Sequence, residues 1–528
     1  MTAPADDSFA QLSLRHLREV VAIDSQSDER SQTIPTTQGQ RVLADRLARF
    51  HEALGAEVER DASANVIASY PGRGRGVDRA PIALMVHLDT ARGTAVPDTL
   101  RVLRDWDGSP VPFPKNPAVR VGLATYPAMH AFVDQDIVYG PGDRPFGLDD
   151  KLGLAHCMTL ATVLAERAKQ AEQAEQAEQE PVDAPPLIFV ARPDEEVGRD
   201  AAVIELADRL AARGVRWGYT IDGILPFEIN VENFNAAAAS VLFPARPARV
   251  LATAPKPWVA KIGGVNSHGA TAAAEGHRPA TRLAALWQAA LDPAEATIIR
   301  FASDSLRDCD AELHLWIAEG AESRVREALA AVVDPHRIRG ASWSLEPGGE
   351  ATAGGAVEDM LRWVHHFLTS DPGFTLAAED SAGRDGYSQP YRALPTEQGI
   401  RLDIRLRDFD PERLERRIAH VCGLAGERSV DTKHQYVSMG PQLAAHPGLA
   451  QAAQRAGAAA EVATITQPIR GGTGVDPFLA VGIPVANLGT GYFAPESEKE
   501  LTSLQMMAGH ARWLLALTAD LAVHGPKA

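Results

Sequence analysis

Four short segments place a histidine or carboxylates where an expected strand ends or an expected helix begins. In an open, mostly parallel sheet the carboxyl ends of the strands meet at one crevice, so these side chains are expected to converge. One imidazole with several carboxylates and no cysteine suits Zn, Mn or Co in a site that can also hold a hydrolytic water. The residues concerned are His87, Asp89, Asp149, Asp150, Glu195, Glu196 and Asp222.

Each segment has an ordinary structural explanation when it is taken alone. A histidine two residues before an aspartate at a strand end is usually a hydrogen-bonded pair, and paired acids before a glycine usually form a solvated turn. Acids at the start of a helix cap its free N–H groups and suit its dipole. These explanations do not account for all the segments occurring together, each at the end of an element.

The hydrophobic pattern predicts the elements that would position these residues. Amphipathic helices are expected at 8–24 and about 39–54, and a third from Asp150 to about Gln179, ending in the solvated repeat QAEQAEQAEQE. Residues 91–146 are rich in Pro, Gly and Asp and predict a loop-rich excursion. Apolar runs predict strands at 65–70, 81–87, 186–191, 217–221 and 484–488. The fold class expected is α/β, with a mixed, mostly parallel sheet and helices on both faces.

The middle of the chain has a different pattern. Alternating segments such as VAKIGGV and RLDIRLRDF occur there with helical segments such as SRVREALAAVV. We therefore expect a catalytic domain formed by residues 1–237 and 438–528, interrupted by an enlarged α/β lid domain at 238–437.

Composition excludes several classes of function. The 528 residues carry a net charge of −17, which argues against nucleic acid and anionic membrane surfaces as partners. Three widely spaced cysteines form no disulfide framework and fit a reducing compartment. No apolar run approaches about 18 residues, and the N-terminus has acids where a signal peptide has basic residues. A cytoplasmic protein is expected.

A series of collinear segments resembles the M20 metallopeptidases, and in particular their peptidase T (tripeptide aminopeptidase) branch. The resemblance implies the zinc-peptidase-like catalytic domain with a lid, and a short peptide as substrate. The segments are TIPTTQGQ, VHLDT, GLDDKLG, PDEEVG, YTIDG, VENFNAA, VNSHGATA, LRDFD and IRGGT.

The resemblance implies a site for two divalent metal ions. His87 and Asp222 would bind the first ion and Glu196 the second, while Asp149 would bridge both. Asp89, two residues after His87, would orient that histidine.

Four further residues receive roles from the same resemblance. Glu195 would be the general base that takes a proton from the attacking water and passes it to the leaving amine. His268 in the lid would steady the oxyanion. Arg407 and Arg470 would anchor the carboxylate end of the substrate, a task that suits a bidentate guanidinium.

The chain departs from the family at two positions. The family's last ligand is a histidine four residues before a glutamate; if Glu500 matches that glutamate, Glu496 replaces the histidine. The second site would then hold oxygen ligands only, which favour harder ions such as Mn or Mg over zinc. The expected cofactors are two divalent ions, zinc with Mn or Co as the alternative at the second site. The other departure is Gly474, where the family usually has aspartate directly after GGT.

Three interpretations of function remain open at this point. The first is a dinuclear aminopeptidase or tripeptidase, and the second is an N-acyl amino acid amidase or carboxypeptidase-like hydrolase of the same fold. The third is a non-catalytic homologue that keeps a metal. A homodimer through the lid is compatible with each of them.

Overall fold

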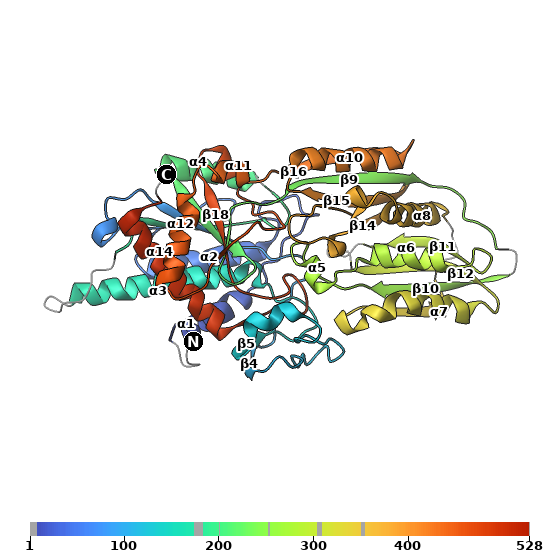
Figure 1. The fold of residues 1–528 in the computed structure, drawn as a ribbon, viewed down its shortest axis with the longest axis horizontal. Coiled ribbons are helices and arrows are strands. Elements are labelled where there is room, and N and C mark those ends of the chain that lie inside the picture. The colour runs from blue at the N-terminus through green and yellow to red at the C-terminus, as the bar shows by residue number, and fades with distance from the viewer. Residues whose placement is uncertain are drawn as a thin grey trace.

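The computed structural model describes residues 8–173, 183–199, 201–251, 254–303, 309–349 and 354–526, which form two lobes along the long axis (Figure 1). The larger lobe is built on an eight-stranded sheet with the order β1-β2-β6-β3-β7-β18-β8-β17. Its central strands pair in parallel, whereas β1, β2 and β8 have antiparallel neighbours. The predicted mixed, mostly parallel α/β sheet is thus confirmed. The bounds are β1 Glu57–Arg60, β2 Val66–Tyr70, β3 Ile82–His87, β6 Leu187–Arg192, β7 Trp217–Gly223, β8 Glu228–Asn230, β17 Ile465–Thr466 and β18 Val485–Gly489.

Helices pack around this sheet. Strands β3 and β6 are buried at every residue, which requires cover on both faces. The helix predicted to start at Asp150 begins at Leu148 and continues to Gln173. The rest of the QAEQAEQAEQE repeat lies outside the described residues. Among the described residues, no helix has both the length and the apolar character needed to cross a membrane. The helices of this lobe are α1 Ser8–Val21, α2 Gln38–Ala53, α3 Leu148–Gln173, α4 Ala201–Ala212, α11 Gly440–Leu443, α12 Gly448–Ala459, α13 Asp476–Ala480 and α14 Leu504–His524.

The segment predicted as a loop-rich excursion contains a small sheet. Strands β4 (Arg101–Trp106) and β5 (Gln135–Tyr139) pair with β19 (Leu501–Ser503) and cover a separate apolar cluster that includes Trp106 and Tyr126. The sequence pattern did not predict this sheet, because its apolar residues are spread among Gly and Pro and its third strand is remote in the chain.

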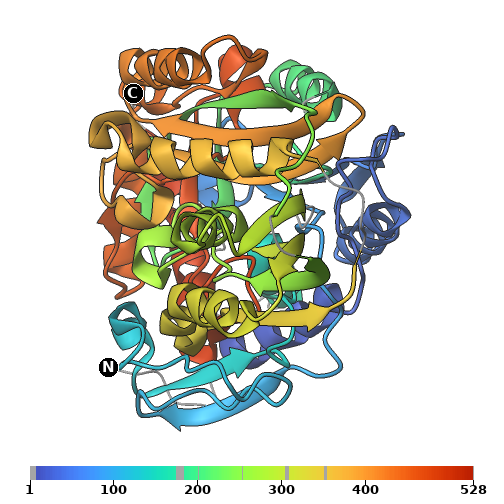
Figure 2. The ribbon, with the colours of Figure 1, turned by 90° about the vertical axis from the view of Figure 1, so that its right-hand side faces the viewer.

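The smaller lobe carries two four-stranded sheets, β14-β15-β9-β16 and β11-β12-β10-β13, and faces the viewer in Figure 2. Helices α6, α7, α8 and α10 pack against these sheets. The connectivity supports an inserted lid, and its boundaries at 238 and 437 stay a prediction. The bounds are β9 Asn235–Pro244, β10 Pro255–Gly263, β11 Ala296–Ala302, β12 Asp310–Ala318, β13 Ser342–Pro347, β14 Tyr387–Thr396, β15 Gly399–Asp408, β16 Val430–Tyr436, α5 Ala272–Glu275, α6 Ala280–Ala290, α7 Glu322–Val333, α8 Ala356–Thr369, α9 Pro372–Thr375 and α10 Pro411–Ala425.

Buried histidines make the stability of the fold sensitive to acid. Burial lowers the pKa of His16 and His51 to about 4 and that of His277 to about 3. Because the same groups titrate near 6.5 in the unfolded chain, unfolding takes up protons, and stability should fall from about pH 6.5 to about pH 4. In His51→Gln, the slope of the unfolding free energy against pH should decrease by up to about 1.4 kcal/mol per pH unit. Urea unfolding between pH 4.5 and 7 measures this, and an unchanged slope would contradict it.

Candidate metal centre

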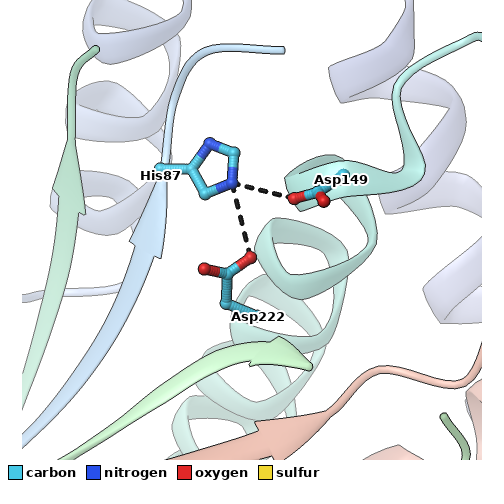
Figure 3. Close-up of side chains that lie close together, drawn as sticks. All are labelled: His87, Asp149 and Asp222. Carbon is cyan, nitrogen blue, oxygen red and sulfur yellow. Dashed lines mark hydrogen bonds and ion pairs between the residues drawn. The ribbon is translucent and has the colours of Figure 1, made fainter. Parts of the chain in front are cut away.

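Three of the predicted ligands meet at the carboxyl ends of β3 and β7 and the start of α3 (Figure 3). His87 is the last residue of β3, Asp222 lies next to the end of β7, and Asp149 is in the first turn of α3. The Nε2 atom of His87 lies 2.9 Å from Asp149 Oδ1 and 3.4 Å from Asp222 Oδ1. Their ligand atoms all lie within 4.8 Å of one another, so the three side chains can hold one metal ion.

A second group shares Asp149 with the first. One ligand atom each of Asp149, Glu196 and Glu496 lie within 4.8 Å of one another. The structure therefore brings together all five predicted ligands, with Asp149 common to both groups. Tyr492, which the sequence pattern did not single out, donates from its hydroxyl to the other oxygen of Asp149 at 3.2 Å.

The electrostatics of these groups fit bound cations. Burial raises the pKa of Glu196 well above its usual value, and the charges of Glu496 and Asp149 raise it further. Burial and the charge of Asp222 raise the pKa of Asp149. The Oε1 atom of Glu196 is buried and has no hydrogen-bond partner in the structure. Crowded carboxylates with an unpaired buried oxygen form a donor set that suits two divalent ions.

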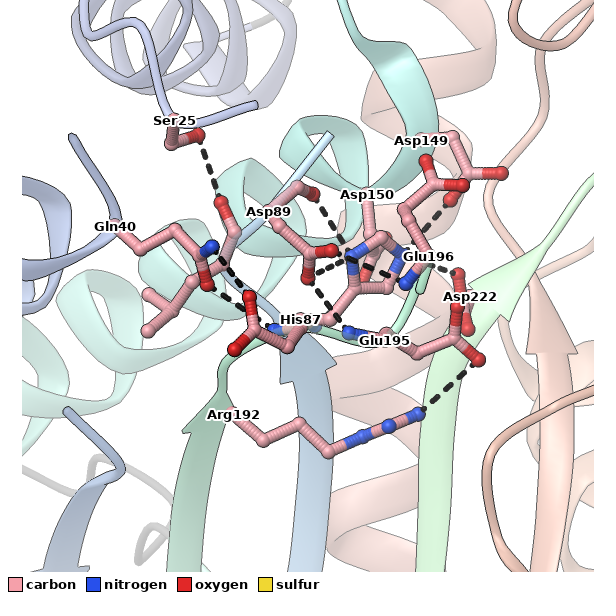
Figure 4. Close-up of polar contacts among 12 residues, drawn as sticks. Ser25, Gln40, His87, Asp89, Asp149, Asp150, Arg192, Glu195, Glu196 and Asp222 are labelled. Atoms are coloured by element: carbon pink, nitrogen blue, oxygen red, sulfur yellow. Dashed lines mark hydrogen bonds and ion pairs between the residues drawn. The ribbon is translucent and has the colours of Figure 1, made fainter. Parts of the chain in front are cut away.

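Asp89 ties the histidine segment to the paired glutamates (Figure 4). Its carboxylate accepts hydrogen bonds from the backbone N–H groups of Glu195 at 2.9 Å and Glu196 at 3.1 Å. The same carboxylate lies 3.4 Å from Nδ1 of His87, which also contacts the Asp89 backbone oxygen at 2.9 Å. Burial alone would raise the pKa of Asp89, but the His87 contact and these N–H groups keep it low. One buried carboxylate thus positions both segments.

Asp194 is a further positioning residue that the sequence analysis missed. Its carboxylate accepts hydrogen bonds from the Thr36 backbone N–H at 2.9 Å, the Thr36 hydroxyl at 2.5 Å and the Gln40 amide at 2.7 Å. These contacts fix the PDEE turn to the TIPTTQGQ segment. In the sequence, the only signal for this contact is that the TIPTTQGQ and PDEEVG motifs occur in the same chain, because the two segments are far apart.

Glu500 positions the two loops that carry Asp149 and Glu496. Its carboxylate accepts from the N–H groups of Phe146 and Gly147 and, at the other oxygen, from that of Glu496, each at 2.9 Å. The residue is 1% exposed, so these bonds are shielded from water.

Glu500→Gln is expected to destabilise the protein by about 2 kcal/mol, because an amide replaces a charged acceptor of buried N–H groups. Urea unfolding measures the loss, and Glu205→Gln, the same substitution at an exposed position of α4, is the control. An unchanged midpoint of unfolding in Glu500→Gln would contradict this role.

The three residues predicted to contact the substrate, His268 and Arg407 in the lid and Arg470 in the IRGGT loop, belong to neither group of metal ligands. His268 lies beside Gly471 of the IRGGT loop, where an added Cβ would be 3.4 Å from its Cε1 atom. Arg470 donates to the backbone oxygens of Gly383 and Asp385, and Arg407 to that of Ala237. Both guanidinium groups are thus engaged in holding backbone, and their predicted contact with substrate stays a prediction.

A histidine downstream of Glu496 does not replace the missing ligand. His510, in α14, stacks on His156 and Phe227 with ring centroids 4.9 and 4.3 Å apart. Burial lowers its pKa well below the usual value. His510 is therefore a neutral core residue.

Comparisons with known proteins agree with this geometry. No protein-family model matches the chain. Peptidase T of Vibrio parahaemolyticus is 24% identical over 512 residues, which cover 94% of this chain and 95% of that protein. Peptidase T of Parabacteroides distasonis is 29% identical over 225 residues, 42% of this chain, and this match spans about half of that relative, 51%.

Among solved structures, the fold is similar to that of a tripeptidase from Staphylococcus aureus. The TM-score is 0.51 at 17% identity, and the match covers 97% of this chain and 98% of the other. The matches to the Vibrio parahaemolyticus and Staphylococcus aureus proteins cover nearly the whole chain, as do the sequence segments that resemble the family. The chain is thus a distant relative of peptidase T, in agreement with the resemblance of its motifs to the M20 metallopeptidases.

Proposed function

We propose that this protein hydrolyses short peptides at the amino-terminal peptide bond, as an aminopeptidase or tripeptidase that depends on two divalent metal ions. The observation that carries the proposal is the pair of ligand groups that share Asp149, with Glu195 directly before the ligand Glu196. His87, Asp149 and Asp222 would hold one ion, and Asp149, Glu196 and Glu496 the other. Bound there, the ions would acidify water and polarise the scissile carbonyl.

The remaining chemistry belongs to side chains of the chain. Glu195 is 20% exposed at its side chain, so that its carboxylate can reach a substrate while its backbone is held by Asp89. It would take a proton at a carboxylate oxygen from the attacking water and deliver it to the leaving nitrogen. Asp89 would keep His87 in one ring orientation, with Nε2 toward Asp149.

The lid supports this proposal through contacts with the loops of the site. The side-chain amide of Asn266 donates to the Glu496 backbone oxygen at 3.1 Å, and Lys499 donates to the Asn266 backbone oxygen at 2.7 Å. His268 follows Asn266 by two residues. The contact of Asn266 with the Glu496 loop would therefore hold His268 near the scissile carbonyl of a bound peptide.

Hydrolysis of end-blocked peptides tests the proposal. Trialanine, N-acetyl-trialanine and trialanine amide would be incubated with protein loaded with Zn²⁺, Mn²⁺ or Co²⁺, and products separated by chromatography. Trialanine should release its first residue, the N-acetyl peptide should resist, and a chelator should abolish turnover. Cleavage of the N-acetyl peptide instead would indicate the amidase or carboxypeptidase alternative. Metal binding without any cleavage would indicate the non-catalytic homologue.

A further inference from the structure

A buried arginine lies beside the proposed base. Arg192 is the last residue of β6, in register with His87 of β3, and its backbone oxygen accepts from the N–H of Leu88 at 2.8 Å. Its side chain is 4% exposed, and its Nη2 atom lies 3.7 Å from Oε1 of Glu195 (Figure 4). The sheet therefore fixes the backbone of Arg192, and its guanidinium extends toward Glu195.

The loop at 469–474 (IRGGTG) packs against this guanidinium. Nη2 of Arg192 donates to the backbone oxygen of Thr473 at 3.2 Å. The next residue, Gly474, has a φ of +56°, and an added Cβ there would lie 2.6 Å from Nη1 and closer still to Nη2. A side chain at 474 is thus disfavoured both by the backbone conformation and by the guanidinium. Arg192 and Gly474 fit as a pair, which gives the departure at 474 a structural reason.

Burying the charged guanidinium of Arg192 costs free energy. Its Nε atom is buried without a hydrogen-bond partner. An unpaired buried donor on a charged group is destabilising, and a buried charge needs a nearby opposite charge. In the described part of the chain, the carboxylate that lies within 4 Å of this guanidinium is that of Glu195.

We propose that Arg192 is a positioning residue for Glu195. Held by β6 and by Thr473, it fixes the Glu195 carboxylate in one orientation before substrate binds. The base then needs no ordering during the reaction, and small displacements of a reacting group can lower turnover strongly. This inference rests on the proposed function only for its effect on turnover; the orientation of Glu195 can be observed without it.

Kinetics of Arg192 variants give the first test. In Arg192→Met, kcat for trialanine should fall by about 10- to 100-fold, while KM stays within about threefold and the metal content is unchanged. Arg192→Lys should recover part of kcat, and added guanidinium ion should recover part of it in Arg192→Ala. Arg209→Met, which removes contacts with Glu59 and Asp61 away from the site, should leave kcat unchanged.

Crystal structures of the metal-loaded wild type and of Arg192→Met give a test that does not depend on activity. Glu195 should adopt one rotamer in the wild type and a displaced or multiple rotamer in the variant. The same Glu195 rotamer in both structures would overturn the proposal, as would unchanged kcat in an active enzyme. A wild type that cleaves no peptide would overturn the proposed function, and the two structures would still decide whether Arg192 positions Glu195.

Discussion

Replacing Glu195 by glutamine is expected to lower kcat for trialanine by about 100-fold or more, with metal content near that of the wild type. Glutamine keeps the size of the side chain but cannot accept the proton of the attacking water. The backbone N–H of residue 195 would still donate to Asp89, so the turn that carries Glu196 should keep its conformation. Steady-state kinetics together with metal analysis of the same sample measure both quantities.

The neighbouring residue supplies the matched control for this prediction. Glu196→Gln changes the same functional group one position later, in a side chain grouped with Asp149 and Glu496. It should lose metal from one of the two sites, whereas Glu195→Gln should not. If Glu195→Gln retains wild-type turnover, or if both variants lose metal equally, the assignment of Glu195 as the base is wrong.

The ligands of the candidate site could be predicted from sequence because a parallel sheet limits where strand ends can go. The runs before His87 and Asp222 are apolar enough to mark buried strands, and their carboxyl ends must then lie at the same edge. The position of Glu496 required the resemblance to a family, since no strand pattern leads to it. The structure nevertheless places it with Asp149 and Glu196.

The positioning residues could not be predicted, because their roles exist only as contacts between distant segments. Glu500 acts through backbone N–H groups, which every residue type except proline can supply. Asp194 holds a backbone N–H and two side chains of a distant segment, those of Thr36 and Gln40. Arg192 reads in the sequence as the charged end of a strand, and nothing in its spacing from Gly474 predicts that they meet. The small sheet of β4, β5 and β19 escaped prediction in part for the same reason, since β19 pairs with β5 across most of the chain.

The charge of Glu496 predicts an unusual dependence on metal. Four carboxylates, those of Asp149, Glu196, Asp222 and Glu496, cancel the formal charge of two divalent ions, whereas a histidine at position 496 would leave one positive charge. The extra carboxylate should weaken the acidification of water, and ligands that are all oxygen favour harder ions than zinc. Activity of the wild type is therefore expected to be stimulated by Mn²⁺ or Co²⁺ and to be low with Zn²⁺ alone.

Glu496→His should reverse this dependence, raising zinc occupancy of the second group of ligands and lowering the pH at which peptide hydrolysis appears. Metal titration with measured stoichiometry, and kcat followed across pH, give the two readouts. Glu427→His is the control, because it makes the same substitution at an exposed position after α10, outside both ligand groups. Equal zinc stoichiometry and an unchanged pH profile in Glu496→His would mean that Glu496 binds no metal. The second site would then consist of Asp149 and Glu196 alone, or only one ion would be held.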